Sequence, residues 1–175
     1  HQFTAAGTYP VILTVTDVGG ASHSVTQSVL VSEPAGSACT PGLVDVDCTV
    51  VVNQRSTLTI TLDQLSCELN SRVTVRPPYA QTAFFNVCFQ PQGATYTLRD
   101  AGGLPRVFEA GTQVVIRFTR GEPGLGEPPA GPPAANLTGT GPNWTISVDD
   151  GGNTGGPGEP DFTDVVMSVD ATPAP

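Results

Sequence analysis

Residues 112–120 read Thr-Gln-Val-Val-Ile-Arg-Phe-Thr-Arg, and this stretch has the pattern of a β-strand with one buried face. Val114, Ile116 and Phe118 occupy every second position. The polar residue Arg117 lies between Ile116 and Phe118, and Thr119 follows Phe118. Successive side chains of a strand point to opposite faces of a sheet, so these three residues share one face. The stretch therefore predicts a strand that packs on a hydrophobic core.

Similar short runs recur along most of the chain, separated by turn residues. We expect strands at Cys48–Asn53, Thr57–Leu62, Arg72–Arg76, Thr82–Gln90, Thr95–Arg99, Thr112–Arg120, Asn143–Val148 and Thr163–Asp170. Many short alternating strands with frequent turns are typical of an all-β sandwich. A single helical turn over Asp63–Ser71, capped by Asp63, is an open alternative to irregular structure there.

Composition agrees with an all-β fold and excludes several functions. The 175 residues include 20 Gly and 17 Pro, too many for a helical bundle. The net charge is −9 and the few basic residues are scattered arginines. The chain therefore lacks the continuous positive surface that binds nucleic-acid phosphates. No apolar run approaches the roughly 18 residues needed for a membrane span.

The first 32 residues predict a β-hairpin. One face of its first strand carries Tyr9, Val11, Leu13 and Val15. Asp17-Val-Gly-Gly20 then reverses the chain. One face of the second strand carries Val25, Val29 and Val31. A lone hairpin is marginally stable in water, so further strands are expected beside it.

The hairpin segment, His1–Ser32, resembles the last strands of a PKD domain, a small immunoglobulin-like β-sandwich of extracellular and cell-surface proteins. The resemblance rests on the pattern aromatic-x-x-x-Gly-Thr-Tyr-x-Val-x-Leu-x-Val-x-Asp, followed by Gly-Gly and an alternating Val strand. The earlier strands of such a domain, and its usual Asp-Gly-Asp type of loop, are not in this sequence. The resemblance implies that strands from a longer parent protein, or from a neighbouring subunit, complete the sandwich.

These observations divide the chain into three parts. From the resemblance we expect residues 1–32 to be the C-terminal part of a PKD-like domain. We expect residues 33–38 to be a linker and residues 39–172 a second, disulfide-stapled β-sandwich. Within the second domain, residues 121–135 hold five prolines and four glycines, which predicts an exposed loop with polyproline character. A spacer between strands is favoured there over a recognition motif.

Four cysteines predict two disulfides. None lies in a Cys-x-x-Cys pair and the chain has only two histidines, so a zinc site is disfavoured. Of the three possible connectivities we favour Cys39–Cys48 with Cys67–Cys88, because each closes a modest loop. Disulfides indicate an oxidising compartment, and we expect the protein outside the cell or on its surface. Residues 1–20 lack a secretory signal pattern, so we expect a mature chain or part of a longer one.

An acidic, glycine-rich loop at residues 149–164 is the candidate ion site. Ca²⁺ takes six to eight oxygen ligands, and glycine lets the main chain wrap around an ion. The candidate ligands are five carboxylates and one amide: Asp149, Asp150, Asn153, Glu159, Asp161 and Asp164. The alternative, a solvated hairpin loop that holds no ion, stays open.

The end of this loop resembles the strand entry of calcium-associated extracellular β-domains in bacteria. The matching residues are Pro-Asp-Phe-Thr-Asp-Val-Val, residues 160–166. The resemblance implies that Phe162 anchors the core and that Asp161 and Asp164 flank it. Thr163 departs from the pattern, which usually has Asn at that position.

No pattern in the chain predicts catalysis. Motifs of serine hydrolases, phosphate loops and zinc proteases are missing from the sequence. His23 lies on a predicted strand without an acid nearby, and Asp45 and Asp47 have the spacing of a solvated strand face. Asn136 and Asn143 fit the N-glycosylation pattern, a weak signal in a Thr-rich chain.

Two functions remain. The first is a non-catalytic structural or assembly protein, such as a subunit of a cell-surface filament, surface layer or adhesion appendage, with other protein subunits as partners. The second is a carbohydrate-binding or surface-ligand-binding accessory module of a secreted enzyme. The aromatic residues are few and several lie at core positions, so glycan binding has the weaker support. The two functions share one fold, which does not decide between them.

Overall fold

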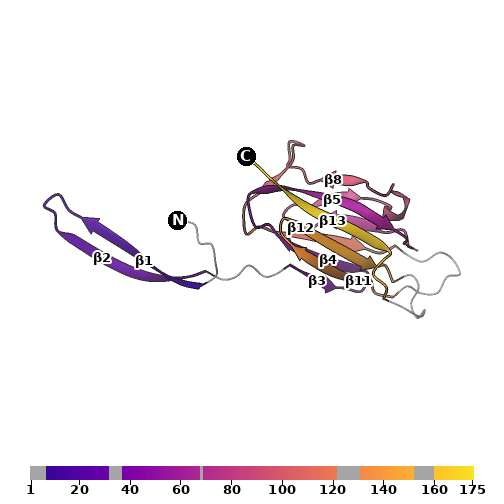
Figure 1. Ribbon diagram of the computed structural model, residues 1–175, viewed down its shortest axis with the longest axis horizontal. Coiled ribbons are helices and arrows are strands. Elements are labelled where there is room, and N and C mark those ends of the chain that lie inside the picture. The colour runs from indigo at the N-terminus through magenta and orange to yellow at the C-terminus, as the bar shows by residue number, and fades with distance from the viewer. Residues whose placement is uncertain (1–6, 32–36, 68, 122–130, 152–159) are drawn as a thin grey trace. The chain divides into compact units, whose positions relative to one another are not determined.

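A computed structural model describes residues 7–31, 37–67, 69–121, 131–151 and 160–175 (Figure 1). Its contacts divide the chain into an amino-terminal unit, His1–Ala35, and a sandwich unit, Gly36–Pro175. The fold is all-β, as the sequence predicted, with 58% of the described residues in strands and 2% in helix. Within the described residues, no helix is long and apolar enough to cross a membrane.

The amino-terminal unit consists of one antiparallel hairpin, formed by β1 (Gly7–Thr16) and β2 (Ser22–Val31). Asp17 closes the turn, because its Oδ1 accepts hydrogen bonds from the Gly19 and Ala21 backbone N–H groups at 2.8 and 2.9 Å. Gly20 has a φ of 84°, which glycine adopts without steric cost. The local sequence therefore defines this turn.

The sandwich unit contains two antiparallel sheets. Their strands are given below in spatial order, so that neighbours in each order are hydrogen-bonded to each other. The order in the first sheet is β3 (Ala38–Pro41), β4 (Asp45–Val51), β10 (Gln113–Thr119), β6 (Arg72–Val75) and β7 (Gln81–Phe84). The order in the second is β11 (Ala134–Thr140), β12 (Asn143–Asp149), β13 (Val165–Pro173), β5 (Ser56–Leu65) and β8 (Thr95–Thr97). The short β9 (Val107–Phe108) also pairs with β5.

A hydrophobic core of described residues lies between these sheets. Strands β4, β5, β10 and β13 alternate buried and half-buried residues along most of their length. The three apolar residues of the 112–120 stretch, Val114, Ile116 and Phe118, are at most 2% exposed. They belong to one buried cluster with Trp144 and Met167 of the second sheet. Apolar burial on facing sheets is the main stabilising term of such a sandwich.

Two disulfides staple the sandwich unit, and their pairing is the one favoured from the sequence. Cys39–Cys48 joins β3 to β4, in which the two residues are directly opposite. Cys67–Cys88 joins the segment after β5 to the 3₁₀ helix η1 (Val87–Phe89). In the chain-entropy account, loops of these lengths stabilise the fold by about 3 kcal/mol each.

The outer face of the first sheet carries an ion-pair network. Arg117 Nε and Nη2 donate to the two carboxylate oxygens of Asp47 at 2.7 and 2.8 Å, and Arg117 Nη1 lies 2.7 Å from Asp45 Oδ2. Arg76 Nη1 lies 2.8 Å from Asp47 Oδ2. The hydrogen bond from Arg117 is the main cause that lowers the pKa of Asp47. The sequence placed these acids on a solvated strand face, whereas they are half-buried and ion-paired.

The structure decides against one open alternative and corrects one prediction for residues 63–90. Residues 63–65 belong to β5, because they continue its pairing with β13, and the described residues up to 71 contain no helical turn. The strand predicted at Thr82–Gln90 ends at Phe84 and is followed by η1. Asn86 has a φ of 52°, a left-handed conformation that interrupts a strand.

Three strands were missed. Strand β3 begins at Ala38, which the sequence assigned to the linker, and β11 begins at Ala134, within the predicted loop 121–135. Strand β9 has only two residues. Strands β3 and β11 lie at sheet edges and carry few buried apolar side chains, so their sequences lack the alternation that reveals a central strand.

Candidate metal centre

The candidate metal centre lies at one end of the second sheet, where β12 ends and β13 begins. Asp149 is the last residue of β12, and Asp161 and Asp164 precede β13. The two strands are antiparallel, with Val148 opposite Val165. This register brings Asp149 and Asp164 to the same end of adjacent strands.

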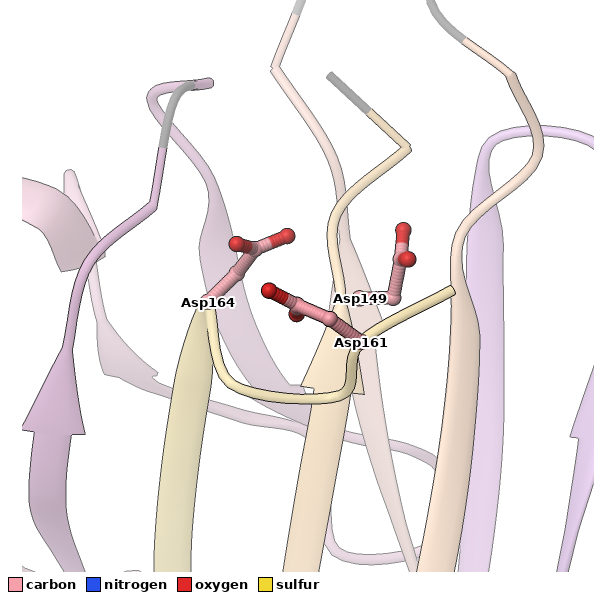
Figure 2. A group of neighbouring side chains, drawn as sticks. All are labelled: Asp149, Asp161 and Asp164. Carbon is pink, nitrogen blue, oxygen red and sulfur yellow. The ribbon is translucent and has the colours of Figure 1, made fainter. Parts of the chain in front are cut away.

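The carboxylates of Asp149, Asp161 and Asp164 form a compact cluster (Figure 2). One oxygen from each lies within 4.8 Å of the others. Asp149 is 5% exposed, Asp164 is half-buried and Asp161 is exposed. The cluster is therefore closed towards the core and open towards solvent.

Tight turns hold two of the three side chains. Asp149 Oδ1 accepts a 2.7 Å hydrogen bond from the Gly151 N–H, and Asp161 Oδ1 accepts a 2.9 Å bond from the Thr163 N–H. Gly151 has a φ of 73°, and a Cβ there would lie 2.5 Å from the Gly131 carbonyl oxygen. Only glycine fits both the conformation and the space, so the chain must have glycine at this position of the turn.

Ser66 fixes the other side of the cluster. Its hydroxyl donates to the Thr163 carbonyl oxygen at 2.8 Å, and its backbone N–H donates to the Asp164 carbonyl oxygen at 2.8 Å. These bonds attach the entry of β13 to the segment after β5. No sequence pattern indicates this role of Ser66, because it depends on a pairing between distant segments.

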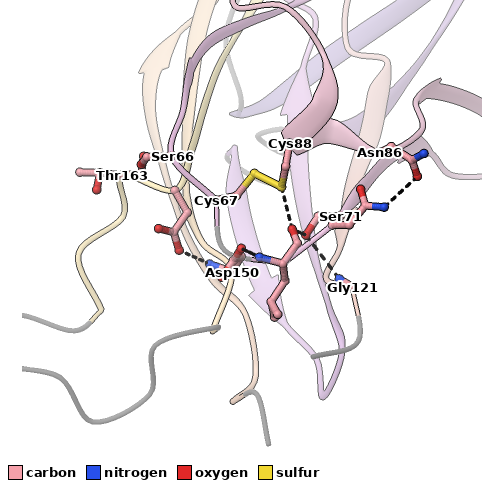
Figure 3. The surroundings of a disulfide bond; sticks show 11 residues. Ser66, Cys67, Ser71, Asn86, Cys88, Gly121, Asp150 and Thr163 are labelled. Atoms are coloured by element: carbon pink, nitrogen blue, oxygen red, sulfur yellow. Dashed lines mark hydrogen bonds between the residues drawn. A yellow bond between two sulfur atoms is a disulfide. The ribbon is translucent and has the colours of Figure 1, made fainter. Parts of the chain in front are cut away.

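Asp150 has a different role from its neighbours. It is fully buried, and its Oδ2 accepts a 2.8 Å hydrogen bond from the Leu69 N–H. Its own N–H donates to Asp164 Oδ2 at 2.7 Å. Figure 3 shows Asp150 beside the segment that carries the Cys67–Cys88 disulfide. Asp150 thus positions Asp164 and is not one of the three clustered carboxylates.

The cluster concentrates negative charge in a partly desolvated place. The pKa of Asp164 is raised to about 7 from the usual 3.8, chiefly by burial. The hydrogen bond from the Asp150 N–H opposes this shift, and the charges of Asp150, Asp149 and Asp161 add to it. Either a proton or a cation relieves such repulsion.

The donor set defines the kind of ion that this group could hold. All three side chains offer carboxylate oxygens, and neither histidine nor cysteine belongs to the group. Oxygen-only ligands suit hard cations, whereas zinc and copper sites use imidazole or thiolate. Asn153 and Glu159, the other two candidate ligands from the sequence, lie outside the described residues.

The two glycosylation candidates occupy different surroundings. Asn136 is an exposed residue of the edge strand β11. Asn143 is also exposed, but its Nδ2 donates to Asp170 Oδ1 at 2.6 Å. A glycan on Asn143 would have to replace this bond.

No protein-family model, curated protein or solved structure matches this chain.

Proposed function

We propose that the protein is a non-catalytic structural and assembly component of the cell exterior, in which the β1–β2 hairpin docks on another β-sheet and Ca²⁺ binds the acidic cluster. The exposed apolar face of the hairpin is the observation that carries this proposal. The two disulfides support an extracellular location, because such bonds persist in oxidising compartments.

The hairpin has one apolar and one largely polar face. Its register places Val25 opposite Leu13 and Val29 opposite Tyr9, so the apolar positions of both strands share a face. The exposed fractions on that face are Val11 44%, Leu13 63%, Val15 62%, Val25 56% and Val29 39%. The other face carries mainly Ser and Thr, with hydroxyl pairs such as Thr14–Ser24 at 2.7 Å.

In a β-sandwich, a strand pair has one apolar face, which packs on the second sheet, and one polar face, which contacts solvent. The hairpin has such a pair of faces. Complete burial of an exposed Val or Leu side chain contributes roughly 1.5–3 kcal/mol. These five side chains are 39–63% exposed, so covering them would gain about half of that value for each and favour docking. Among the described residues this sheet has only two strands, so each strand has an edge that no third strand covers. The resemblance of His1–Ser32 to the closing strands of a PKD domain agrees with this role.

Calcium is the cation that we propose for Asp149, Asp161 and Asp164. An irregular, partly open set of carboxylates suits Ca²⁺, which tolerates varied geometry, better than Mg²⁺, which demands an octahedral shell and retains its waters. Backbone carbonyls and water would complete the coordination. The ion would offset the burial and the neighbouring negative charges that together raise the pKa of Asp164.

Light scattering coupled to size-exclusion chromatography tests the assembly role on native material, with and without EDTA. We expect a particle much larger than the 18.0 kDa chain, with β1 and β2 amides protected from hydrogen exchange. A monomer whose hairpin amides exchange freely would overturn the proposal. The variant pair Val15→Thr with Val25→Thr should weaken assembly, because it makes the apolar face polar while keeping β-branched residues. Val18→Thr in the turn makes the same chemical change outside the face, and serves as the control.

A further inference from the structure

A second candidate site lies in the sandwich unit, in a groove beside the turn between β6 and β7. The groove has a volume of about 490 Å³ and opens to solvent. Ligand sites in proteins have volumes of roughly 300–1,000 Å³. The side chains that define its chemistry are Tyr79, Gln81, Tyr96, Arg99 and Arg106.

Gln81 locks the walls of the groove together. Its Nε2 donates to the carbonyl oxygens of Tyr79 and Arg99, at 3.1 and 2.8 Å. Its Oε1 accepts from the Tyr96 hydroxyl at 3.1 Å and from the Arg99 N–H at 2.8 Å. Every donor and acceptor site of the amide is used. The groove is therefore preorganised, which lowers the entropy lost when a ligand binds.

The two arginines are also held in place. Arg99 Nη1 donates to the Gly103 carbonyl oxygen at 2.6 Å, and Arg106 Nε donates to the Arg99 carbonyl oxygen at 3.3 Å. The Arg106 guanidinium carbon lies 5.4 Å from the centre of the Tyr79 ring. These contacts leave the terminal amino groups of Arg106 without an acceptor among the described residues.

No carboxylate in the described part of the chain pairs with either arginine. Arg55, Arg76 and Arg117 form ion pairs with acids, but Arg99 and Arg106 do not. Asp100 also lines the groove, yet its Oδ1 accepts backbone N–H groups of Gly102 and Leu104, at 2.9 and 3.0 Å. Two positioned guanidinium groups without an acid partner, in a chain of net charge −9, mark a place for an external anion.

We propose that this groove binds an acidic polysaccharide through its uronate carboxylates, with Arg99 and Arg106 as the binding residues. A guanidinium matches a carboxylate in geometry and charge. Tyr79 and Tyr96 line the groove half-buried, and the Tyr79 hydroxyl has no hydrogen-bond partner among the described residues, which suits a sugar better than an apolar side chain. The groove is open to solvent, so a polymer bound in it can continue past its rim. This site is independent of the acidic cluster and of the hairpin.

Titration of the chain with polygalacturonate oligomers, followed by NMR chemical shifts in EDTA at about 0.15 M salt, tests the proposal. EDTA is needed because polyuronates themselves bind Ca²⁺. We expect shifts at Tyr79, Gln81 and Arg106, and none with the methyl-esterified oligomer, which lacks the charge. Equal binding of the esterified oligomer, or no shift with the acidic one, would overturn the proposal.

Variants separate recognition from general attraction of charge. Arg106→Gln and Arg99→Gln should each weaken binding by about tenfold or more, as expected for a lost charge-assisted pair. Arg106→Lys should recover part of the affinity, since it restores charge without the planar fork. Arg72 is an exposed arginine without an acid partner in the described residues, so Arg72→Gln is the matched control and should change affinity less than about twofold.

Two further results would contradict the proposal. An equal loss of affinity in the Arg72 variant would mean that the oligomer senses net charge alone. Equally tight binding of a poly-glutamate peptide in the groove would show that the site selects carboxylates and not saccharides. The core resonances of each variant show whether it is folded, and Arg106→Lys provides the test if Arg106→Gln does not fold.

Discussion

The Leu69 backbone N–H donates a 2.8 Å hydrogen bond to Asp150 Oδ2, across 81 residues of sequence. Both residues are buried, with exposed fractions of 4% and 0%. The bond joins the start of the acidic loop to the segment held by the Cys67–Cys88 disulfide, where Cys88 Sγ lies 2.7 Å from the Leu69 carbonyl oxygen (Figure 3). Because Asp150 also positions Asp164, the geometry of the acidic cluster depends on this segment.

Replacing Asp150 tests this dependence. Asp150→Ala leaves the buried Leu69 N–H without its acceptor, so we expect the free energy of unfolding to fall by about 1–3 kcal/mol. Asp150→Asn retains an acceptor oxygen and should lose less. Urea denaturation in EDTA measures both variants. If the two were equally stable, the hydrogen bond would not contribute to stability.

The raised pKa of Asp164 predicts how the metal-free protein responds to pH. Its pKa is about 7 when folded, against the usual 3.8, so the folded state binds more protons between these values. The stabilisation is therefore complete below pH 3.8, decreases as the pH rises, and is lost above about 7. Urea denaturation in EDTA across this window should show the decline. Asn cannot ionise, so the Asp164→Asn variant should lack the part of the decline that the titration of Asp164 causes.

Calcium should reverse this pH response and stabilise the sandwich. A ligand at about 100 times its Kd raises the free energy of unfolding by roughly 2.7 kcal/mol. Calorimetric titration with CaCl₂ should give a Kd that Asp161→Asn weakens by about tenfold or more. Asp100→Asn is the control. Asp100 accepts a hydrogen bond from the backbone N–H of the residue two positions later, as Asp161 does, but it lies outside the acidic cluster. Equal affinity in the two variants would exclude Asp161 as a ligand.

The ion-pair network on the first sheet predicts a separate effect in acid. The pKa of Asp47 is lowered, so its contribution to stability is present above 3.8 and lost as the pH falls through its folded-state pKa. Asp47→Asn should cost about 1–2 kcal/mol at pH 7. Asp63 has no ion pair among the described residues, and Asp63→Asn should change little. Denaturation curves at pH 7 compare the two.

The alternation of apolar and polar residues predicted most strands of the sandwich. It failed for segments in which that alternation is weak. Val114, Ile116 and Phe118 are buried as expected, because a central strand must bury one face to exist. Strand β11 has no such requirement at a sheet edge, and its Gly139 lacks a side chain to pack. The end of the Thr82–Gln90 prediction was wrong because apolar residues also occur in the turn that follows Phe84, where Phe85 is 62% exposed.

The candidate site was predictable only as a loop. Its charge and glycine content identified Asp149, Asp161 and Asp164, which the β12–β13 register brings together. The role of Asp150 depends on the backbone N–H of Leu69, and a backbone donor leaves no mark in the sequence. The groove at Arg99 and Arg106 was missed for a similar reason, because its walls come from separate segments joined by Gln81.

The link from disulfide to acidic cluster gives the most specific prediction. Replacing Cys67 and Cys88 by Ser should reduce the free energy of unfolding by about 3 kcal/mol. It should also weaken Ca²⁺ binding, because the Leu69 segment would hold Asp150, and through it Asp164, less firmly. Replacing Cys39 and Cys48 by Ser makes the same chemical change between β3 and β4, and should lower stability while leaving Ca²⁺ affinity unchanged. Calorimetric titration of the two double variants, each below its unfolding temperature, compares them. Equal Kd values would mean that the acidic cluster keeps its geometry without the Cys67–Cys88 bond.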